Sequence, residues 1–301
     1  PLPFLDTSFK GFKWLRRRSV RASPGGSAVG TPRTQPAAMT AGAGPGWPTS
    51  SRCDLSLMSA SRCGKGTVIY IASDVHIVPE GKREKFEGFL EEARAHGEML
   101  VLAGDIYDLA RYPLMDILQG PDGGRYHQQL ILTANRIPTT IIEGNHDFGL
   151  AASRELLPSA FQIRKGPLSL DNIPGRPLIL HGWQEYDVSL APLAPFYSWL
   201  FPHFPRWAYL YDRVFATPSV VKKQSLPRFY RTVLRMHYRA MADAMARDRT
   251  IIWGHTHWRG VWPVQVSPQQ TWVMANAGDF VDGPGGLVLN PRTGFVHVWK
   301  S

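Results

Sequence analysis

Five apolar segments of strand length in this chain each end in a polar cluster that contains Asp, Asn or His. They are residues 67–73, 99–104, 139–144, 177–182 and 250–254. In the last of them, "TIIWG", the apolar run stops at Gly254, and His255 and His257 follow with one residue between them. A single ending of this kind is best explained as a polar loop. Five of the chain's ten histidines lie at these ends, however, so the repetition constrains both the fold and the site.

The order of apolar segments predicts the fold class. Between the first two segments, residues 82–96 carry apolar side chains at helical spacing: Phe86, Phe89, Leu90 and Ala93. Continuous apolar strands separated by a helix are typical of an α/β protein whose sheet is buried on both faces. Residues 272–300 hold three further apolar runs without long helices between them, which favours a second sheet. We therefore predict an α/β fold, a four-layer α/β/β/α sandwich formed by residues 67–301.

The first 66 residues differ from the rest in composition. They hold ten basic and two acidic side chains, a balance of +8 within a net charge of +10. Because the basic charge belongs mostly to this segment, we expect no nucleic-acid partner for the folded part. The segment is rich in Pro, Gly, Ser, Thr and Ala, which bury too little apolar surface to offset the entropy of ordering. We predict that residues 1–66 are a disordered, basic, low-complexity tail.

Two interpretations of this tail stay open. It resembles a targeting peptide in being rich in Arg and Ser and poor in acid, or it is an extension upstream of a start at Met39 or Met58. The second is favoured because Met58 lies just before the first strand. Both cysteines, Cys53 and Cys63, lie in the tail, which excludes a disulfide framework in residues 67–301 and fits a reducing compartment. We expect a cytoplasmic protein that can associate peripherally with a membrane.

The polar clusters predict a metal site. Sites in open α/β sheets form beyond the carboxyl ends of strands, where rigid strands aim side chains at one point. Seven groups are expected to converge there: Asp74, His76, Asp105, Asn145, His181, His255 and His257. Oxygen and imidazole ligands without thiolate select Mn, Fe or Zn. Seven are too many for one four-coordinate zinc and fit two divalent ions that share a bridging carboxylate.

The series Asp-x-His, Gly-Asp, Gly-Asn-His-Asp, His and Gly-His-x-His, spread over residues 67–281, resembles the calcineurin-like metallophosphoesterase family. The resemblance implies a hydrolase of phosphoric ester or diphosphate bonds that uses two metal ions, with Mn expected and Fe or Zn as alternatives. It implies that one ion is held by Asp74, His76 and His257. It implies that the other is held by Asn145, His181 and His255, with Asp105 as the bridge. It also implies that His146 protonates the leaving oxygen or stabilises the transition state, and that Asp147 orients His146.

Residues 184–249 form a long insert between the fourth and fifth segments. Nine aromatic side chains lie between Phe196 and Phe215, and residues 228–247 predict a helix with one apolar and one basic stripe. The basic stripe consists of Arg228, Arg231, Arg235 and Arg239. These arginines are either a solvated face or a binding surface for substrate phosphate. Taken as a whole, the insert predicts a helical cap that meets acyl chains or a bilayer surface.

Within the superfamily, "SDVH", "GDIYD", "GNHDF" and "NAGDFVDG" resemble the UDP-2,3-diacylglucosamine hydrolase branch, which cleaves a nucleotide–lipid diphosphate. Typical members of that branch carry Arg where His146 stands, and the residues after His181 also differ. Three hypotheses are therefore compared. The first is a phosphoesterase acting on a nucleotide or lipid diphosphate. The second is a soluble phosphodiesterase acting on small phosphodiesters or nucleic-acid ends. The third, a non-catalytic scaffold, is disfavoured because all seven ligands and His146 are present.

Overall fold

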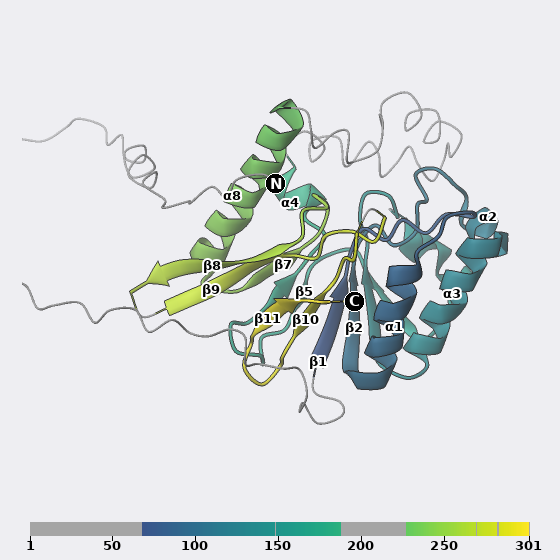
Figure 1. Ribbon diagram of the computed structural model, residues 1–301, viewed down its shortest axis with the longest axis horizontal. Helices are drawn as coiled ribbons and strands as arrows, with labels where there is room; N and C mark the ends of the chain where they lie inside the picture. Colours follow the sequence, from purple (N-terminus) through teal and green to yellow (C-terminus); the bar gives the residue numbers. More distant parts are fainter. Residues whose placement is uncertain (1–67, 148, 188–226, 269, 282, 301) are drawn as a thin grey trace, which may run out of the picture. The chain divides into compact units, whose positions relative to one another are not determined.

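The computed structural model describes residues 68–147, 149–187, 227–268, 270–281 and 283–300. The predicted tail, residues 1–66, and the aromatic part of the insert, residues 196–215, lie outside the described residues. The described part of the chain folds into two sheets with helices against them (Figure 1).

The first sheet has the strand order β11-β10-β1-β2-β3-β4. Its strands are β1 (Val68–Ala72), β2 (Gly97–Ala103), β3 (Thr139–Ile142), β4 (Phe161–Arg164), β10 (Leu287–Leu289) and β11 (Val296–Val298). Strands β1 to β4 are parallel, whereas β10 is antiparallel to β1 and β11 is antiparallel to β10. Because β1, β2 and β3 are parallel, their carboxyl ends meet at one edge, where Asp74, Asp105 and Asn145 follow.

The second sheet has the order β5-β6-β7-β9-β8. Its strands are β5 (Leu168–Ser169), β6 (Leu178–Ile179), β7 (Ile251–Trp253), β8 (Gly260–Ser267) and β9 (Gln270–Asn276). Strands β6, β7 and β9 are parallel, and β5 and β8 pair with them in the antiparallel sense. The carboxyl ends of β6 and β7 therefore lie at a common edge, where His181 and the two histidines after Gly254 follow.

Helices cover the outer face of each sheet, so the predicted four-layer sandwich is confirmed (Figure 1). On the first sheet lie α1 (Glu84–His96), α2 (Leu114–Gln119) and α3 (Pro121–Ala134). On the second sheet lies α8 (Pro227–Arg247), with the short α4 (Trp183–Tyr186) against it. A 3₁₀ segment, η3 (Leu150–Leu156), contacts β4. The helix predicted at residues 228–247 is thus the fourth layer of the sandwich.

Strand β1 shows how the sequence produces these layers. Successive side chains of a strand point to opposite faces. Ile69 and Ile71 accordingly pack between the sheets with Ile252, whereas Tyr70 packs beneath the helices with Phe89. Burying each such side chain stabilises the fold by about 1.5–3 kcal/mol. Both faces of the strand are therefore apolar, which explains the continuous apolar runs in the sequence.

Two parts of the fold differ from the sequence prediction. The last two runs do not join the second sheet: β10 pairs with the free edge of β1, which places Leu287 and Leu289 in the core between the sheets. The helix α3 was not predicted, because Gly123 and the next glycine weaken the helical pattern. Gly123 is needed there, since a Cβ atom would collide with the Ile117 carbonyl oxygen of α2.

Candidate metal centre

The backbone at the strand ends adopts a conformation that L-residues rarely occupy. Five of the seven predicted ligands have positive φ angles: Asp74 (53°), His76 (49°), Asp105 (56°), His255 (67°) and His257 (58°). Outside glycine, the described residues contain only two others, Arg176 and Asp248. Such conformations cost of the order of 1–3 kcal/mol each and cluster at functional sites. Most of the strained backbone in the described part thus coincides with the predicted ligands.

Glycines let these turns approach one another. Gly104, with a φ of 89°, precedes Asp105, and a Cβ atom at this position would collide with the ring of His181. A Cβ atom at Gly144 would collide with the Asp105 carboxylate. The close approach of the neighbouring site residues therefore requires glycine at these two positions.

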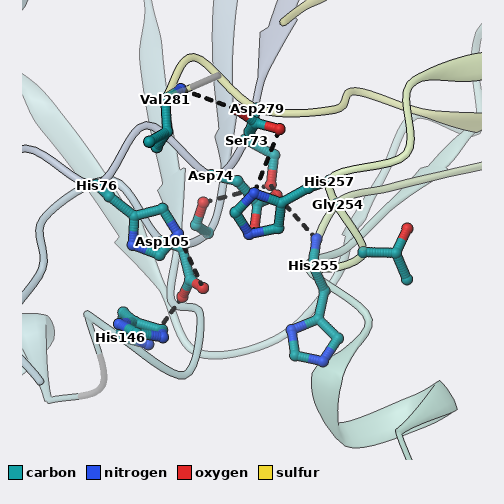
Figure 2. Close-up of polar contacts among 12 residues, drawn as sticks. Ser73, Asp74, His76, Asp105, His146, Gly254, His255, His257, Asp279 and Val281 are labelled. Carbon is teal, nitrogen blue, oxygen red and sulfur yellow. Dashed lines mark hydrogen bonds and ion pairs between the residues drawn. The ribbon is translucent and has the colours of Figure 1, made fainter. Parts of the chain in front are cut away.

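The first cluster consists of Asp74, His76 and His257, which each offer a ligand atom within 4.8 Å of the others. Asp74 Oδ2 accepts hydrogen bonds from Ser73 Oγ (2.6 Å) and the His255 amide (2.8 Å) (Figure 2). These bonds fix the carboxylate so that Oδ1 faces His257 Nε2 at 3.3 Å. The residues predicted to hold one ion are therefore together in the structure.

The second cluster consists of Asp105, His181 and His255, again with ligand atoms within 4.8 Å. His181 Nδ1 lies 2.9 Å from the Ala103 carbonyl oxygen, and an N–H on Nδ1 can donate to it. This contact leaves Nε2 as the nitrogen that faces Asn145 Oδ1 at 3.2 Å and Asp105 Oδ2 at 3.3 Å. The residues predicted to hold the other ion are also together.

Asp105, a member of the second cluster, also faces the first. Its Oδ1 accepts a hydrogen bond from the His146 amide at 2.8 Å, which orients the carboxylate (Figure 2). Its Oδ2 lies 3.9 Å from His76 Nε2, in the first cluster, and 3.3 Å from His181 Nε2, in the second. Asp105 is 2% exposed, so water does not compensate this charge. One carboxylate oxygen thus faces imidazoles of both clusters.

The polar atoms left without partners fit bound cations. Among the described residues, Asp74 Oδ1 and both ring nitrogens of His76 are buried and make no hydrogen bond. A buried polar atom without a partner costs about 1–3 kcal/mol. A divalent ion would satisfy these atoms, and the carboxylate, imidazole and amide oxygen donors are the types that Mn, Fe and Zn accept. The residues present therefore fit a metal centre.

The electrostatics of the cluster agree with a cation site. Burial by itself raises the pKa of Asp105, but the neighbouring His181 and His146 hold that pKa well below its usual value. Burial by itself lowers the pKa of His181, but the Asp105 carboxylate raises it to about 10. In the metal-free protein a proton on His181 therefore takes the place of the positive charge that an ion would supply.

The family model for calcineurin-like phosphoesterases matches residues 67–259. The chain belongs to this family. It is therefore a hydrolase that acts on phosphoester bonds, in a metal-dependent family whose candidate ligands lie together here. No curated protein matches the sequence. None of the described helices is both long and apolar enough to cross a bilayer.

Solved structures similar to this phosphoesterase have low sequence identity to it. Vacuolar protein sorting 29 from Cryptosporidium parvum is 12% identical, with a TM-score of 0.37 over 79% of this chain and 98% of that chain. The phosphoesterase YfcE from E. coli is 15% identical, with a TM-score of 0.36 over 74% and 87% of the two chains. The nuclease MPE from Pseudomonas putida is 14% identical, with a TM-score of 0.34 over 72% and 77%. The family membership rests on the sequence match.

The surroundings of His146 correct one prediction about the phosphoesterase. His146 Nδ1 contacts Asp108 Oδ1 at 2.9 Å, and Arg111 Nη1 contacts the other oxygen of Asp108 at 3.1 Å. Asp147 was expected to orient His146, but its carboxylate accepts hydrogen bonds from the backbone amides of Ile106 (2.7 Å) and Gly144. The buried Asp147 therefore ties two strand-end turns together, and Asp108 is the carboxylate that holds the imidazole.

Asp108 was missed as a site residue although the signal was present. It lies three residues after Asp105 in "GDIYD", and both carboxylates contact His146, Asp105 at the backbone amide and Asp108 at ring Nδ1. Burial by itself lowers the pKa of His146, but Asp105 and Asp108 raise it to about 9 in the absence of an ion.

The predicted arginine stripe lies on α8, in the outer layer. Arg231 and Arg235 are exposed, and Arg239 is partly buried and donates to the Tyr186 carbonyl oxygen at 2.8 Å. The backbone of Arg228 is helical, and its side chain lies outside the described residues. The predicted apolar stripe of α8 packs against the second sheet through Met236. The role of the exposed arginines in binding substrate stays a prediction.

Proposed function

We propose that this phosphoesterase holds two divalent metal ions and hydrolyses a phosphoester or diphosphate bond without a covalent enzyme intermediate. The observation that supports this most strongly is the position of Asp105 Oδ2, which faces His76 in one cluster and His181 in the other. A carboxylate oxygen placed in this way is the arrangement that a bridging ligand requires. Manganese is the proposed metal, with iron or zinc as alternatives.

The proposed ligands fall into two sets, one for each ion, with Asp105 common to both. Asp74, His76 and His257 would hold one ion, and Asn145, His181 and His255 would hold the other, with Asp105 shared. Bound ions of this kind supply an acidic water as a nucleophile near neutral pH and neutralise charge on the phosphate. The chain's part is to keep these ligands at fixed positions through the buried hydrogen bonds of Asp74, Asp105 and His181.

His146 is proposed as the group that donates a proton to the leaving oxygen. Its Nδ1 is held by Asp108, so Nε2 is the nitrogen that can face the substrate. The Asp108 carboxylate at Nδ1 raises the pKa of His146, which favours the protonated imidazole that a general acid needs. Asp108 would stabilise the imidazolium before transfer and fix the ring orientation throughout.

The proposed substrate is a nucleotide–lipid diphosphate such as UDP-2,3-diacylglucosamine, with a soluble phosphodiester as the second candidate. The exposed Arg231 and Arg235 support an anionic substrate or an anionic membrane surface. A panel of diphosphate and phosphodiester substrates, assayed with Mn²⁺ in the presence and absence of detergent, separates the two. Turnover of the lipid diphosphate that depends on detergent or vesicles supports the first candidate, and equal turnover of soluble phosphodiesters supports the second.

Metal content tests the dinuclear arrangement directly. The parent protein should retain two equivalents of Mn²⁺. Asn145→Ala should weaken the binding of one ion, whereas Asp105→Asn should weaken the binding of both ions and abolish turnover. The matched control is Asp171→Asn, because Asp171 is exposed and pairs with Arg249 on the surface. Two full equivalents retained by Asp105→Asn would remove the bridging role.

A further inference from the structure

The two histidines of the sequence Gly-His-Thr-His each contact a second carboxylate that lies outside the seven predicted ligands. His255 contacts Asp187, and His257 contacts Asp279. We propose that Asp187 and Asp279 are positioning residues, and that each fixes one histidine for one of the two metal ions. This proposal rests on the dinuclear function proposed above.

Asp279 lies behind the ring of His257. Asp279 Oδ2 is 3.3 Å from His257 Nδ1, and the opposite nitrogen, Nε2, is 3.3 Å from Asp74 Oδ1 (Figure 2). Asp279 Oδ1 accepts a hydrogen bond from the Val281 amide at 2.9 Å, which holds the carboxylate in this orientation (Figure 2). The ring of His257 is therefore placed between two carboxylates. The contact at Nδ1 is an ion-pair contact without hydrogen-bond geometry. A proton held on Nδ1 by the charge of Asp279 leaves the lone pair on Nε2 directed toward the first cluster.

Asp187 has the corresponding position beside His255, but at the other ring nitrogen. Asp187 Oδ2 is 3.2 Å from His255 Nε2, and Asp187 is 5% exposed. An N–H on Nε2 directed at Asp187 leaves Nδ1 as the nitrogen with a lone pair for an ion. The amide of His255 is in turn bound to Asp74, so the backbone and the ring of this histidine are each held by a carboxylate.

The backbone that carries Asp187 is itself anchored to the outer helix. Asp187 directly follows α4, whose last residue, Tyr186, accepts a hydrogen bond from Arg239 through its carbonyl oxygen at 2.8 Å. The Tyr186 hydroxyl donates to Asp243 Oδ2 at 3.0 Å. Both Arg239 and Asp243 lie on α8. Helix α8 thus restrains the position of Asp187 and, through it, the orientation of His255.

A carboxylate behind a ligating imidazole selects the tautomer, orients the ring and raises its basicity. Removing such a partner weakens metal binding by about 10–100-fold. Because Asp279 acts on His257 and Asp187 acts on His255, the two carboxylates should affect different ions. Asp279 belongs with the ion assigned to Asp74 and His76, and Asp187 belongs with the other ion. Selectivity of this kind distinguishes a positioning role from general stabilisation of the fold.

The experiment titrates the metal-free full chain with Mn²⁺ in competition with a chromophoric chelator, and it extracts two affinities. The variants are Asp187→Asn and Asp279→Asn, which keep an acceptor but remove the charge, and Asp187→Ala and Asp279→Ala, which remove both. Asp171→Asn, on the surface, is the matched control. Circular dichroism and thermal melting of the metal-free proteins establish that each variant folds.

Each alanine variant should weaken one of the two affinities by about 10–100-fold and leave the other within a few-fold, with a smaller effect in the asparagine variant. The two sites are told apart by combining each variant with His76→Ala, which removes a ligand of the first ion only. Equal loss at both sites, or no loss in either alanine variant, would overturn the positioning role. Complete loss of one ion in Asp187→Asn would show that Asp187 is itself a ligand and would overturn its positioning role. A single Mn²⁺ site in the parent protein would instead overturn the dinuclear function.

Discussion

Asp108 holds His146 through a contact of 2.9 Å between Asp108 Oδ1 and His146 Nδ1. Asp108 is completely buried, whereas the His146 side chain is 19% exposed. The same imidazole packs edge-on against the ring of His76, with ring centroids 4.6 Å apart. An imidazole of fixed orientation therefore stands beside the first cluster.

Replacing His146 by Ala should leave both metal ions bound and reduce kcat by about 10²–10⁴-fold, the usual contribution of a general acid. The reason is that the side chain of His146 is assigned to the substrate, and only its backbone amide contacts Asp105. Metal analysis and steady-state kinetics on the same preparation check this. Loss of one equivalent of metal would mean that His146 is a ligand, an arrangement that the proximity of His76, Asp108 and His146 also permits.

Asp108→Asn and Asp147→Asn should behave differently. Asp108→Asn should lower kcat and move the alkaline limb of the pH profile to lower pH, because the imidazolium of His146 loses the carboxylate that raises its pKa. Asp147→Asn should lower the free energy of unfolding by about 1–3 kcal/mol, since an amide nitrogen cannot accept the second of two backbone hydrogen bonds. Chemical denaturation and kinetics of both variants separate these effects. An Asp147→Asn enzyme of unchanged stability would contradict the structural role.

Metal binding should release protons. Burial by itself lowers the pKa of His181, but the Asp105 carboxylate raises it to about 10. At neutral pH both ring nitrogens of His181 therefore carry a proton in the metal-free protein. An ion needs the Nε2 lone pair, so the proton must leave. Below the raised pKa, the affinity for Mn²⁺ should therefore increase by roughly tenfold for each pH unit. Calorimetry in buffers of different ionisation enthalpy counts the protons, and heats that are independent of the buffer would refute the prediction.

His237 should make the stability of the metal-free protein depend on pH. It is buried on α8 among Trp253, Trp258 and Trp262, with ring centroids 4.9–5.2 Å from its own. Burial lowers the pKa of His237 to about 4, from 6.5 for the unfolded chain. Between these pH values the unfolded chain binds more protons, so stability should fall as the pH falls through this window. The contribution of this group is about 3 kcal/mol in total.

The test uses urea unfolding between pH 7 and pH 4 with a chelator present, so that metal loss does not contribute. His237→Gln cannot be protonated in this range, and its free energy of unfolding should fall less steeply than that of the parent. His96→Gln is the control, because His96 is exposed at the end of α1. Parallel pH profiles for the parent and His237→Gln would show that His237 does not carry this dependence.

The sequence by itself determined the sheet strands that matter for the site. Runs such as residues 67–73 are apolar throughout because both faces of β1 are buried, and a pattern caused by burial can be recognised locally. The polar residues directly follow each run in the sequence, which is why all seven candidate ligands could be named. The apolar stripe of α8 was predicted for the same reason.

The tertiary structure decided which partner each of these groups has. Asp147 is adjacent to His146 in the sequence and Asp108 is 38 residues away, yet Asp108 is the one that contacts the ring. Asp187 and Asp279 likewise approach His255 and His257 from separate segments of the chain. The pairing of β10 with β1 rather than with the second sheet is of the same kind. Contacts of this sort depend on how turns close in space, and hydrophobic periodicity along the chain carries no information about them.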